Sequence, residues 1–411
     1  MHSPLDIAIA GAGIAGLACA TLLSREGHRV VVYERFETSR PIGSGLMLQP
    51  TGLAALQRLG LRETIEALGT RIERLHGVTE RGRTIFDLAY GDLDPQFYAV
   101  GIHRAALHET LWNAFLGCGA RLETGRPCVG VETSAGGKAA LRDDKGQLSP
   151  AFDLVIDASG ARSPLRRSVS RNRVSAFAYG AVWASVPDIG IAPSMLAQRY
   201  VAARIMIGYL PVGRASRDGP ALAALFWSLK PGDYESWRAN FANWREHIVS
   251  LWPELASVVE NLTSPDDMTF AGYTQFTARL PFKGSVALVG DSAHATSPQL
   301  GQGANTGLLD ALALRDALSA THDVSSALAL YARKRRDHVR FYQRASAIMT
   351  PFFQSDSRTL SIVRDLTFDR MKIVPYLRRE MVRTLAGLKT GLFTHSLPAV
   401  LAGDPSNASH T

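Results

Sequence analysis

The chain has 411 residues, of which 46% are hydrophobic and 20% are charged, and its formal net charge is +8 at pH 7. A chain of this length is too long to fold around a single hydrophobic core, and its composition is not that of a disordered protein. We therefore predict a globular protein of two or three domains. Only seven of the 45 basic residues are lysines, and the arginines are scattered along the chain. This distribution argues against a nucleic-acid-binding protein.

Cysteine and histidine usage narrows the class further. The three cysteines, Cys19, Cys118 and Cys128, have neither the number nor the spacing of a disulfide framework or a metal-binding pair. The histidines are dispersed without a ligand spacing, so we expect no metal. We therefore expect a protein of the reducing cytoplasm.

The first 35 residues predict a strand, a tight turn, a helix and a second strand. Residues 7–10 form a short apolar strand, residues 14–25 a helix, and residues 30–33 the second strand. Such a unit at the start of a chain is typical of a dinucleotide-binding fold.

The turn between the first strand and the helix is rich in glycine. Gly11 permits the turn, Gly13 lets the main chain approach a pyrophosphate, and Gly16 lets the helix pack on the strand. The start of the helix then offers unpaired amides to the phosphates. Glu34 closes the second strand, where an acidic side chain accepts hydrogen bonds from an adenosine ribose.

Helices are predicted over residues 51–59 and 103–116, with short strands over 72–100 and 120–157. The last of these strands runs into a second notable segment, Asp-Leu-Val-Ile-Asp-Ala-Ser-Gly-Ala-Arg-Ser, at residues 153–163.

Residues 175–280 change character and predict a separate antiparallel sheet. Long runs of aromatic and aliphatic residues predict strands over 176–186, 198–210, 221–229 and 269–277.

A third segment follows at residues 289–294 and 298–305, and two long helices are predicted to begin at about residues 303 and 325. One glycine-rich turn is a weak signal, but three such segments in this order indicate that all of them wrap one FAD.

Near the end of the chain, apolar residues recur at helical spacing among basic ones over residues 376–393. Two interpretations stay open. One is a peripheral helix on an anionic membrane, and the other is a helix packed on the protein with a solvated basic edge. The apolar residues of this basic stripe are Leu377, Met381, Leu385, Leu388 and Leu392, and its basic residues are Arg378, Arg379, Arg383 and Lys389.

Residues 404–411 are predicted to be a disordered tail.

The third segment, Gly-Asp-Ser-Ala-His followed by Pro-Gln-Leu-Gly-Gln-Gly-Ala-Asn, resembles that of the single-component flavoprotein aromatic hydroxylases related to para-hydroxybenzoate and salicylate hydroxylase. The resemblance covers about residues 5–345. It implies that Asp291 and Arg104 contact FAD, that the loop Pro298, Gly301, Gln302 and Gly303 faces the flavin, and that His294 serves packing more than general-base catalysis. The cofactor residues that it and the turn imply are Gly11, Gly13, Ile14, Ala15, Gly16, Glu34, Arg35, Gly45, Leu46, Arg104, Val129, Asp291, Gly303, Ala304 and Asn305.

The second segment departs from that pattern, since the family usually has Asp-Gly where this chain has Ser159-Gly160. The Ala-Ser-Gly form is similar to that of flavin-dependent halogenases and some prenyl reductases. The halogenase lysine is missing, because no lysine precedes Lys138. Ser163 and either Arg166 or Arg167 still fit the hydroxylase pattern.

The resemblance implies an α/β fold: a three-layer Rossmann-like FAD-binding domain, an inserted antiparallel substrate sheet, and C-terminal helices. We assign residues 1–75, 98–174 and 278–345 to the first domain, 76–97 and 175–277 to the second, 346–403 to a helical segment, and 404–411 to the tail. Substrate would lie between the flavin and the inner face of the sheet. The predicted wall residues are Trp183, Tyr200, Met206, Tyr209 and Trp227, with Phe226 beside them.

The implied activity is a monooxygenase that uses FAD, NADPH or NADH, and O2. It would hydroxylate or epoxidise a flat, largely apolar aromatic or unsaturated substrate through a flavin hydroperoxide. A flavin-dependent reductase of a lipid-like double bond, and an FAD-binding protein without turnover, are the alternatives. The oligomeric state is not indicated.

Overall fold

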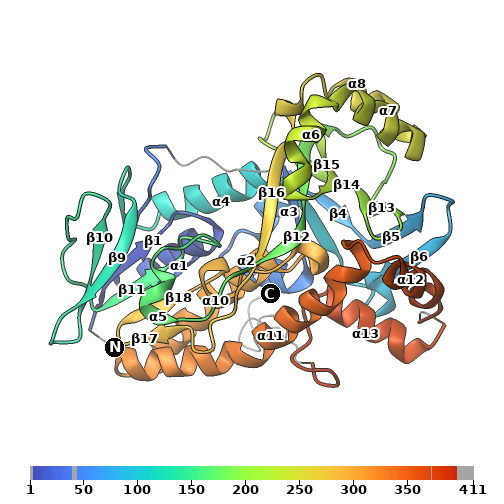
Figure 1. Ribbon diagram of the computed structural model, residues 1–411. Helices are drawn as coiled ribbons and strands as arrows, with labels where there is room; N and C mark the ends of the chain where they lie inside the picture. The colour runs from blue at the N-terminus through green and yellow to red at the C-terminus, as the bar shows by residue number, and fades with distance from the viewer. Residues whose placement is uncertain (1–2, 39–43, 372, 396–411) are drawn as a thin grey trace.

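The computed structural model describes residues 3–38, 44–371 and 373–395. One sheet has six strands in the order β17-β18-β11-β1-β2-β8 and lies at the end of the molecule that holds the N-terminus (Figure 1). Neighbouring strands are parallel except β17 with β18. The strands are β1 (Asp6–Ala10), β2 (Arg29–Tyr33), β8 (Arg121–Glu123), β11 (Leu154–Asp157), β17 (Phe282–Lys283) and β18 (Val286–Leu288).

Helices cover one face of this sheet and a β-hairpin covers the other. Ile7 and Ile9 of β1 pack among α1 (Ile14–Arg25), α4 (Arg104–Leu116) and α10 (Gly303–Ser319). Ala8 and Ala10 point the opposite way, as alternate residues of a strand do, toward the hairpin β9 (Cys128–Thr133) and β10 (Ala139–Asp143). The predicted three-layer α/β class is confirmed.

A second sheet has seven strands in the order β16-β12-β15-β14-β13-β5-β6. The strands within residues 175–280 pair antiparallel, as predicted, and β5 adds one parallel pairing with β13. The prediction of one strand over 198–210 is wrong, because the chain reverses at Ala202, where φ is +48°. The strands are β5 (Arg74–Thr79), β6 (Thr84–Ala89), β12 (Ser175–Pro187), β13 (Met195–Val201), β14 (Ile205–Arg214), β15 (Ala221–Leu229) and β16 (Thr269–Gln275).

Three helices that the sequence analysis missed cover one face of the second sheet. They are α6 (Tyr234–Ala239), α7 (Phe241–Leu251) and α8 (Ala256–Glu260). Trp237 and Trp244 of these helices pack with Trp227 of β15 in one apolar cluster. The opposite face of the sheet is left for the interior of the molecule.

A small three-stranded sheet joins the two larger ones. Its order is β3 (Gly45–Leu48), β7 (Ala99–His103) and β4 (Thr70–Ile72), with α2 (Pro50–Arg58) and α3 (Arg62–Leu68) beside it. The short helices α5 (Arg166–Val169) and α9 (Asp291–His294) follow β11 and β18.

The chain continues with α11 (Val324–Phe353), α12 (Arg358–Met371) and α13 (Pro375–Leu385). α11 passes without a break through residue 345, where we placed the end of the first domain. The domain boundaries stay a prediction, and the predicted tail at 404–411 lies outside the described residues.

The basic stripe over 376–393 is not one helix. α13 ends at Leu385, and Gly387 has a φ of +88° that breaks it. Met381, Leu385 and Leu388 pack into the protein, and Lys389 is buried in an ion pair with Glu380. The structure therefore favours the packed alternative. Within the described ranges, no helix has the length and apolarity that crossing a bilayer requires.

A buried carboxylate ties the third segment to two long helices. Asp310 of α10 accepts the amide of Gly290 (2.8 Å) and contacts His294 Nε2 (2.5 Å) and Arg335 Nε (2.6 Å). Burial alone would raise the pKa of Asp310, but the facing His294 and Arg335 outweigh burial and bring this pKa to about 2. The carboxylate is therefore ionised and central to this packing.

We expect Asp310→Asn to lower the free energy of unfolding by about 3–5 kcal/mol, because the Arg335 guanidinium would stay buried without its partner. Asp316→Asn, which removes the partly exposed partner of Arg315 on the same helix, should cost below about 1 kcal/mol. Urea denaturation followed by circular dichroism measures both. The depressed pKa also means that the contribution of Asp310 is present above the unfolded value of about 4 and is lost as the pH falls toward 2. Equal losses in the two variants would contradict the assignment.

Candidate cofactor and substrate site

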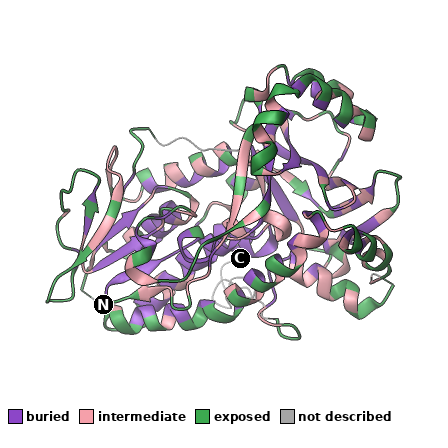
Figure 2. Cartoon of the chain, viewed as in Figure 1, coloured by how far each residue is buried: buried purple, intermediate pink, exposed green. Residues whose placement is uncertain are grey.

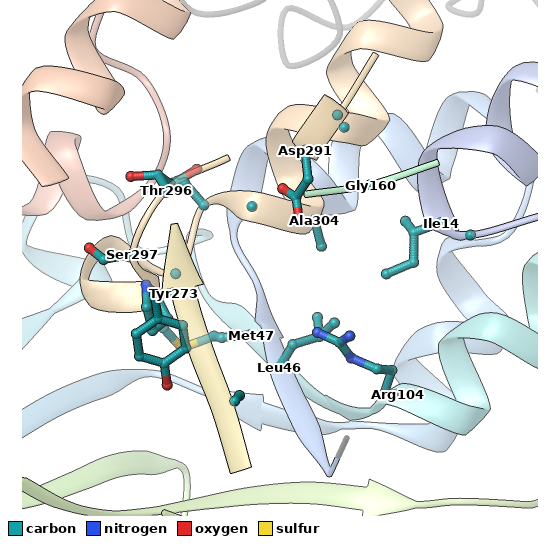
Figure 3. Close-up of a pocket in the computed structure, with 18 of the residues that line it drawn as sticks. Ile14, Leu46, Met47, Arg104, Gly160, Tyr273, Asp291, Thr296, Ser297 and Ala304 are labelled. Carbon is teal, nitrogen blue, oxygen red and sulfur yellow. The ribbon is translucent and has the colours of Figure 1, made fainter. Parts of the chain in front are cut away.

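A cavity of about 1270 Å³ lies between the two larger sheets. Its walls come from the carboxyl ends of β1, β2 and β11, from strands of the second sheet, and from the C-terminal helices. The carboxyl ends of parallel strands lie at one edge of a sheet, so the three predicted segments meet here although they are far apart in the chain. Figure 3 shows residues of several of these segments facing the same space.

The glycine turn forms one end of the cavity. Of its three glycines, only Gly13 has open space beside its main chain. A Cβ on Gly11, whose φ is +106°, would lie 2.7 Å from the Ala158 carbonyl oxygen, and a Cβ on Gly16 would lie 2.0 Å from that of Gly11. A Cβ on Gly13 would meet nothing within 4 Å. The main chain at Gly13 is therefore open to a ligand, which fits the predicted approach of a pyrophosphate.

Glu34 lies at the same end, at the close of β2. Its carboxylate accepts the amides of Ala12 (2.8 Å) and Phe36 (3.1 Å), which hold it at the cavity edge. A carboxylate has acceptor capacity beyond these two bonds, so a ribose hydroxyl can still be bound. Arg35 and Val129 line this end as well.

Arg104 and Asp291 bring opposite charges to the middle of the cavity. Their side chains project from the first residues of α4 and α9 (Figure 3). Burial lowers the pKa of Arg104, and Asp291 partly offsets this. An arginine stays cationic at neutral pH, so the pair suits a diphosphate that is flanked by hydroxyl groups.

Ser159, which stands where the family usually has aspartate, has a structural role. Ser159 Oγ and Ser163 Oγ donate to the buried Asp157 carboxylate at 2.6 and 2.5 Å. Burial raises the pKa of Asp157, and these donors oppose that effect. Ser159 therefore supports Asp157 and fixes the turn that lines the cavity.

Of the two arginines that fitted the second segment, Arg166 joins it to the third. Its guanidinium donates to the carbonyls of Ala161 (2.9 Å), Asp291 (3.0 Å) and Ser292 (2.9 Å). These bonds fix the backbone from which the Asp291 side chain projects.

The predicted flavin-facing loop, Pro298, Gly301, Gln302 and Gly303, lines the cavity where α10 begins. Gly301 has a φ of +60°, which glycine adopts without strain. The Gln302 side chain points away and donates to the Leu385 carbonyl (2.8 Å). The first amides of a helix have no partner within it, so α10 begins at the cavity with donors available.

Two predicted residues lie behind the cavity wall. The Asn305 side chain accepts the amide of Gln49 (2.9 Å) and donates to the carbonyls of Met47 (3.2 Å) and Gly301 (2.8 Å), so it positions the loop and does not line the cavity. The Asn305 side chain thus contacts only protein groups, and the predicted contact of this residue with FAD stays a prediction. His294 is buried against Asp310, in agreement with a packing role.

The other predicted cofactor residues stand at or just behind the wall, and their contacts with FAD stay a prediction. Gly16 packs behind the turn. The resemblance also implies that residues 43–46 form a loop against the flavin ring, and of these Gly43 lies outside the described residues. Those that line the cavity are Gly11, Gly13, Ile14, Ala15, Glu34, Arg35, Gly45, Leu46, Arg104, Val129, Asp291, Gly303 and Ala304.

Three of the five predicted substrate residues line the cavity: Trp183, Tyr200 and Met206. The predictions for Tyr209 and Trp227 are wrong, because successive side chains of a strand point to opposite faces. Tyr209 lies three residues after Met206, and its hydroxyl donates to Asp188 (2.8 Å) outside the cavity. Trp227 packs against Trp244, whereas its neighbour Phe226 lines the cavity.

Much of the substrate wall, which we call the apolar lobe, was not predicted from the sequence. Alternation along β5 and β6 could have indicated Leu75, Phe86 and Leu88, but nothing local shows which side of α11, α12 or α13 faces inward. The apolar lobe is lined by Leu75, Phe86, Leu88, Leu196, Tyr200, Met206, Leu210, Phe226, Met349, Phe352, Phe353, Phe368, Met371 and Met381.

Tyr273 is a further residue that the sequence analysis missed. It lines the cavity from β16, and its hydroxyl oxygen accepts Trp183 Nε1–H (3.1 Å). Burial raises the pKa of Tyr273, so the hydroxyl keeps its proton at neutral pH. With its oxygen already accepting a bond, Tyr273 can donate that proton to a bound molecule.

Charge is segregated within the cavity. The charged lining residues of the described chain all belong to the dinucleotide end and the middle, and none belongs to the apolar lobe. They are Glu34, Arg35, Arg104, Arg126, Arg162 and Asp291. In the described residues, no three His, Cys, Asp or Glu side chains gather as metal ligands would.

Comparison with known proteins agrees with this geometry. Residues 4–346 match the family model described as FAD binding domain. The chain is 33% identical over 335 residues to 3-amino-4-hydroxybenzoate 2-monooxygenase from Streptomyces cremeus, which covers 77% of this chain and 79% of that protein. It is 27% identical to 6-methylpretetramide 4-monooxygenase from Streptomyces rimosus over 96% of this chain and 97% of that protein.

Solved structures share the fold at lower identity. HpxO from Klebsiella pneumoniae, complexed with FAD and uric acid, superposes with a TM-score of 0.77 at 19% identity, over 94% of this chain and 98% of that one. The tetrameric form of 2-methyl-3-hydroxypyridine-5-carboxylic acid oxygenase gives a TM-score of 0.75 at 20% identity, over 89% and 94%.

We expect Gly13→Val to fold like the wild type and to bind FAD about 100-fold more weakly, because valine fits the open space that the pyrophosphate needs. A fluorescence titration with FAD and thermal unfolding of the FAD-free protein test the two parts. Gly16→Val is the matched control, since its Cβ would collide with the Gly11 carbonyl and should lower the melting temperature of the FAD-free protein. Unchanged FAD affinity in Gly13→Val would contradict this geometry.

Proposed function

This chain belongs to the FAD binding domain family of aromatic-ring monooxygenases, and from that premise we propose that it hydroxylates or epoxidises a flat, largely apolar aromatic or unsaturated compound. It is an FAD-dependent oxidoreductase, with NADPH or NADH as reductant and O2 as co-substrate. The observation that carries the choice of substrate is the apolar lobe, which has no charged side chain to pair with a substrate carboxylate.

The residues present fit FAD. The open main chain at Gly13 and the start of α1 suit the pyrophosphate, and Arg104 supplies a cation for it. Glu34 suits the ribose of the adenosine, and Asp291 suits hydroxyl groups next to the diphosphate. The remaining end, at the loop before α10, suits the flavin ring.

When bound, FAD supplies the redox chemistry, taking a hydride from NADPH or NADH and then activating O2 for transfer of one oxygen atom to the substrate. The amides at the start of α10 favour negative charge beside them, so they stabilise an anionic ring system. The apolar lobe holds the substrate and excludes water from the reacting atoms. We assign no acid or base among the loop residues.

Tyr273 orients the substrate in this proposal. Its hydroxyl lies at the cavity wall and retains a proton to donate. Other polar side chains, among them Gln198, Gln299 and Thr384, line the cavity as well. A directed hydrogen bond from Tyr273 would help to select the edge of the substrate that meets the loop.

A reductase of a lipid-like double bond is the second candidate, because the same apolar lobe would hold such a substrate. An FAD-binding protein without turnover is a third. Oxygen use distinguishes all three, since only the monooxygenase consumes O2 in proportion to product.

We expect the FAD-loaded protein to oxidise NADPH or NADH faster when a neutral aromatic compound is added, with O2 consumed and one atom from ¹⁸O2 found in the product. The screen should pair each neutral aromatic with its carboxylated analogue. Because the apolar lobe offers no cation, the neutral member should give the lower KM, by about tenfold or more. Product formed equally well without O2 would favour the reductase.

We expect Tyr273→Phe to lower kcat/KM by about 5- to 100-fold through loss of one directed hydrogen bond, with FAD affinity unchanged. Tyr209→Phe removes a hydroxyl from the opposite face of the same sheet and is the matched control. Steady-state kinetics and the ratio of NAD(P)H consumed to product measure the effect. A Tyr273→Phe enzyme with wild-type kinetics and coupling would remove Tyr273 from the substrate site.

A further inference from the structure

Helix α12 presents apolar side chains to solvent. Arg358, Ile362, Leu366 and Arg370 recur at intervals of four residues, so they lie along one side of the helix. The turn to α13 continues the same character. The apolar side chains of this surface, each between 40% and 74% exposed, are Ile362, Val363, Leu366, Ile373, Val374 and Tyr376.

The opposite side of α12 belongs to the cavity. Phe368 and Met371 line the apolar lobe, and the buried Arg364 lies 4.9 Å from the ring of Tyr200, another lining residue. α12 is therefore apolar on two sides, whereas a helix at a water-facing surface normally has a polar outer side. An exposed apolar patch of this kind marks a contact surface.

The charges around the patch are mostly positive. Residues 358–379 contain six basic and two acidic residues; of the basic ones, Arg364 is buried against Asp365 and Arg378 pairs with Asp92. Both acidic residues already interact with a neighbour: Asp365 pairs with Arg364, and Asp369 also has a partner. Arg358 and Arg370, at the two ends of the row, form no ion pair within the described part of the chain. Exposed apolar side chains flanked by arginines are typical of helices that lie in a bilayer interface.

We propose that α12 and residues 373–376, which lead into the first turn of α13, bind the surface of an anionic lipid bilayer. Ile362, Leu366 and Ile373 enter the interfacial region, and Arg358 and Arg370 contact lipid phosphates. The apolar lobe lies directly behind this surface, so an apolar substrate dissolved in the bilayer has a short path to the cavity. This delivery rests on the proposed function, whereas the membrane contact does not.

The positive charge around this surface favours a lipid bilayer, and not a second copy of the chain, as its partner. A two-fold contact through this patch would bring like patches together, with the arginines of both copies near one another. Like charges across an interface oppose association, whereas an anionic surface attracts them.

Sedimentation of the FAD-loaded full chain with phosphatidylcholine vesicles, with and without phosphatidylglycerol, tests this contact. We expect binding only to the vesicles with phosphatidylglycerol, and less of it at high salt. The double variant Ile362→Ser with Leu366→Ser should reduce the vesicle-bound to free ratio about tenfold or more. The matched control is Leu148→Ser, which removes a leucine of similar exposure that bridges to Arg142 of β10. β10 lies at the opposite end of the molecule from α12 (Figures 1 and 2).

Circular dichroism and FAD content should be the same in both variants and the wild type, since neither site lines the cavity. The proposal is overturned if the wild type binds neither kind of vesicle, or if the control loses as much binding as the double variant. A wild-type dimer that the double variant dissociates in analytical ultracentrifugation, without vesicle binding, would assign the patch to a second copy. The vesicle assay needs no turnover, so an error in the proposed reaction shows up separately, as oxidation that no aromatic compound stimulates.

Discussion

The site depends on hydrogen bonds that extend the parallel sheet past the ends of its strands. Gly11 donates to the Tyr33 carbonyl (2.8 Å), Ala158 to that of Ala10 (2.9 Å), and Val289 to that of Asp157 (3.0 Å). Because these bonds join main-chain groups, the three turns leave the sheet at one edge whatever side chains surround them. Side chains matter where the backbones nearly touch, at Gly11, Gly16 and Ala158. The cavity can therefore form only if the residues at these three positions are small.

The two ends of the cavity bind their ligands through different interactions. At the dinucleotide end, charged side chains and free amides meet a charged cofactor, and their cost of burial is offset by the partner they bind. In the apolar lobe, contact area provides most of the affinity, and Tyr273 elsewhere on the cavity wall adds a directional contact. Met206, Met349, Met371 and Met381 make this wall adaptable, because methionine side chains are flexible and polarizable. Tight selection of the cofactor and a broader choice of substrate can thus coexist.

The elements that short sequence patterns determine were predicted correctly. The strand, turn and helix over residues 7–25 and the helix from residue 303 agree with the structure, because glycine spacing and apolar runs determine them. The reversal at Ala202 was missed because neither glycine nor proline marks it. The faces of Tyr209 and Trp227 were misassigned although strand alternation contained the answer. The inward side of α11 to α13 could not be read from any segment, since it depends on helices packing against β5 and β6 across most of the chain.

The bond from Gln302 to the carbonyl of Leu385 links the cofactor loop to the last helix. The cavity therefore draws on residues from Ala10 to Leu385. During synthesis, the glycine turn leaves the ribosome long before Asp291 and the end of α13 exist. β1 pairs with β11, and β11 can complete its pairing only when β18 exists, so apolar residues of the sheet need shielding in the meantime. The nascent polypeptide thus acquires its complete binding site only after the end of α13 has been synthesised.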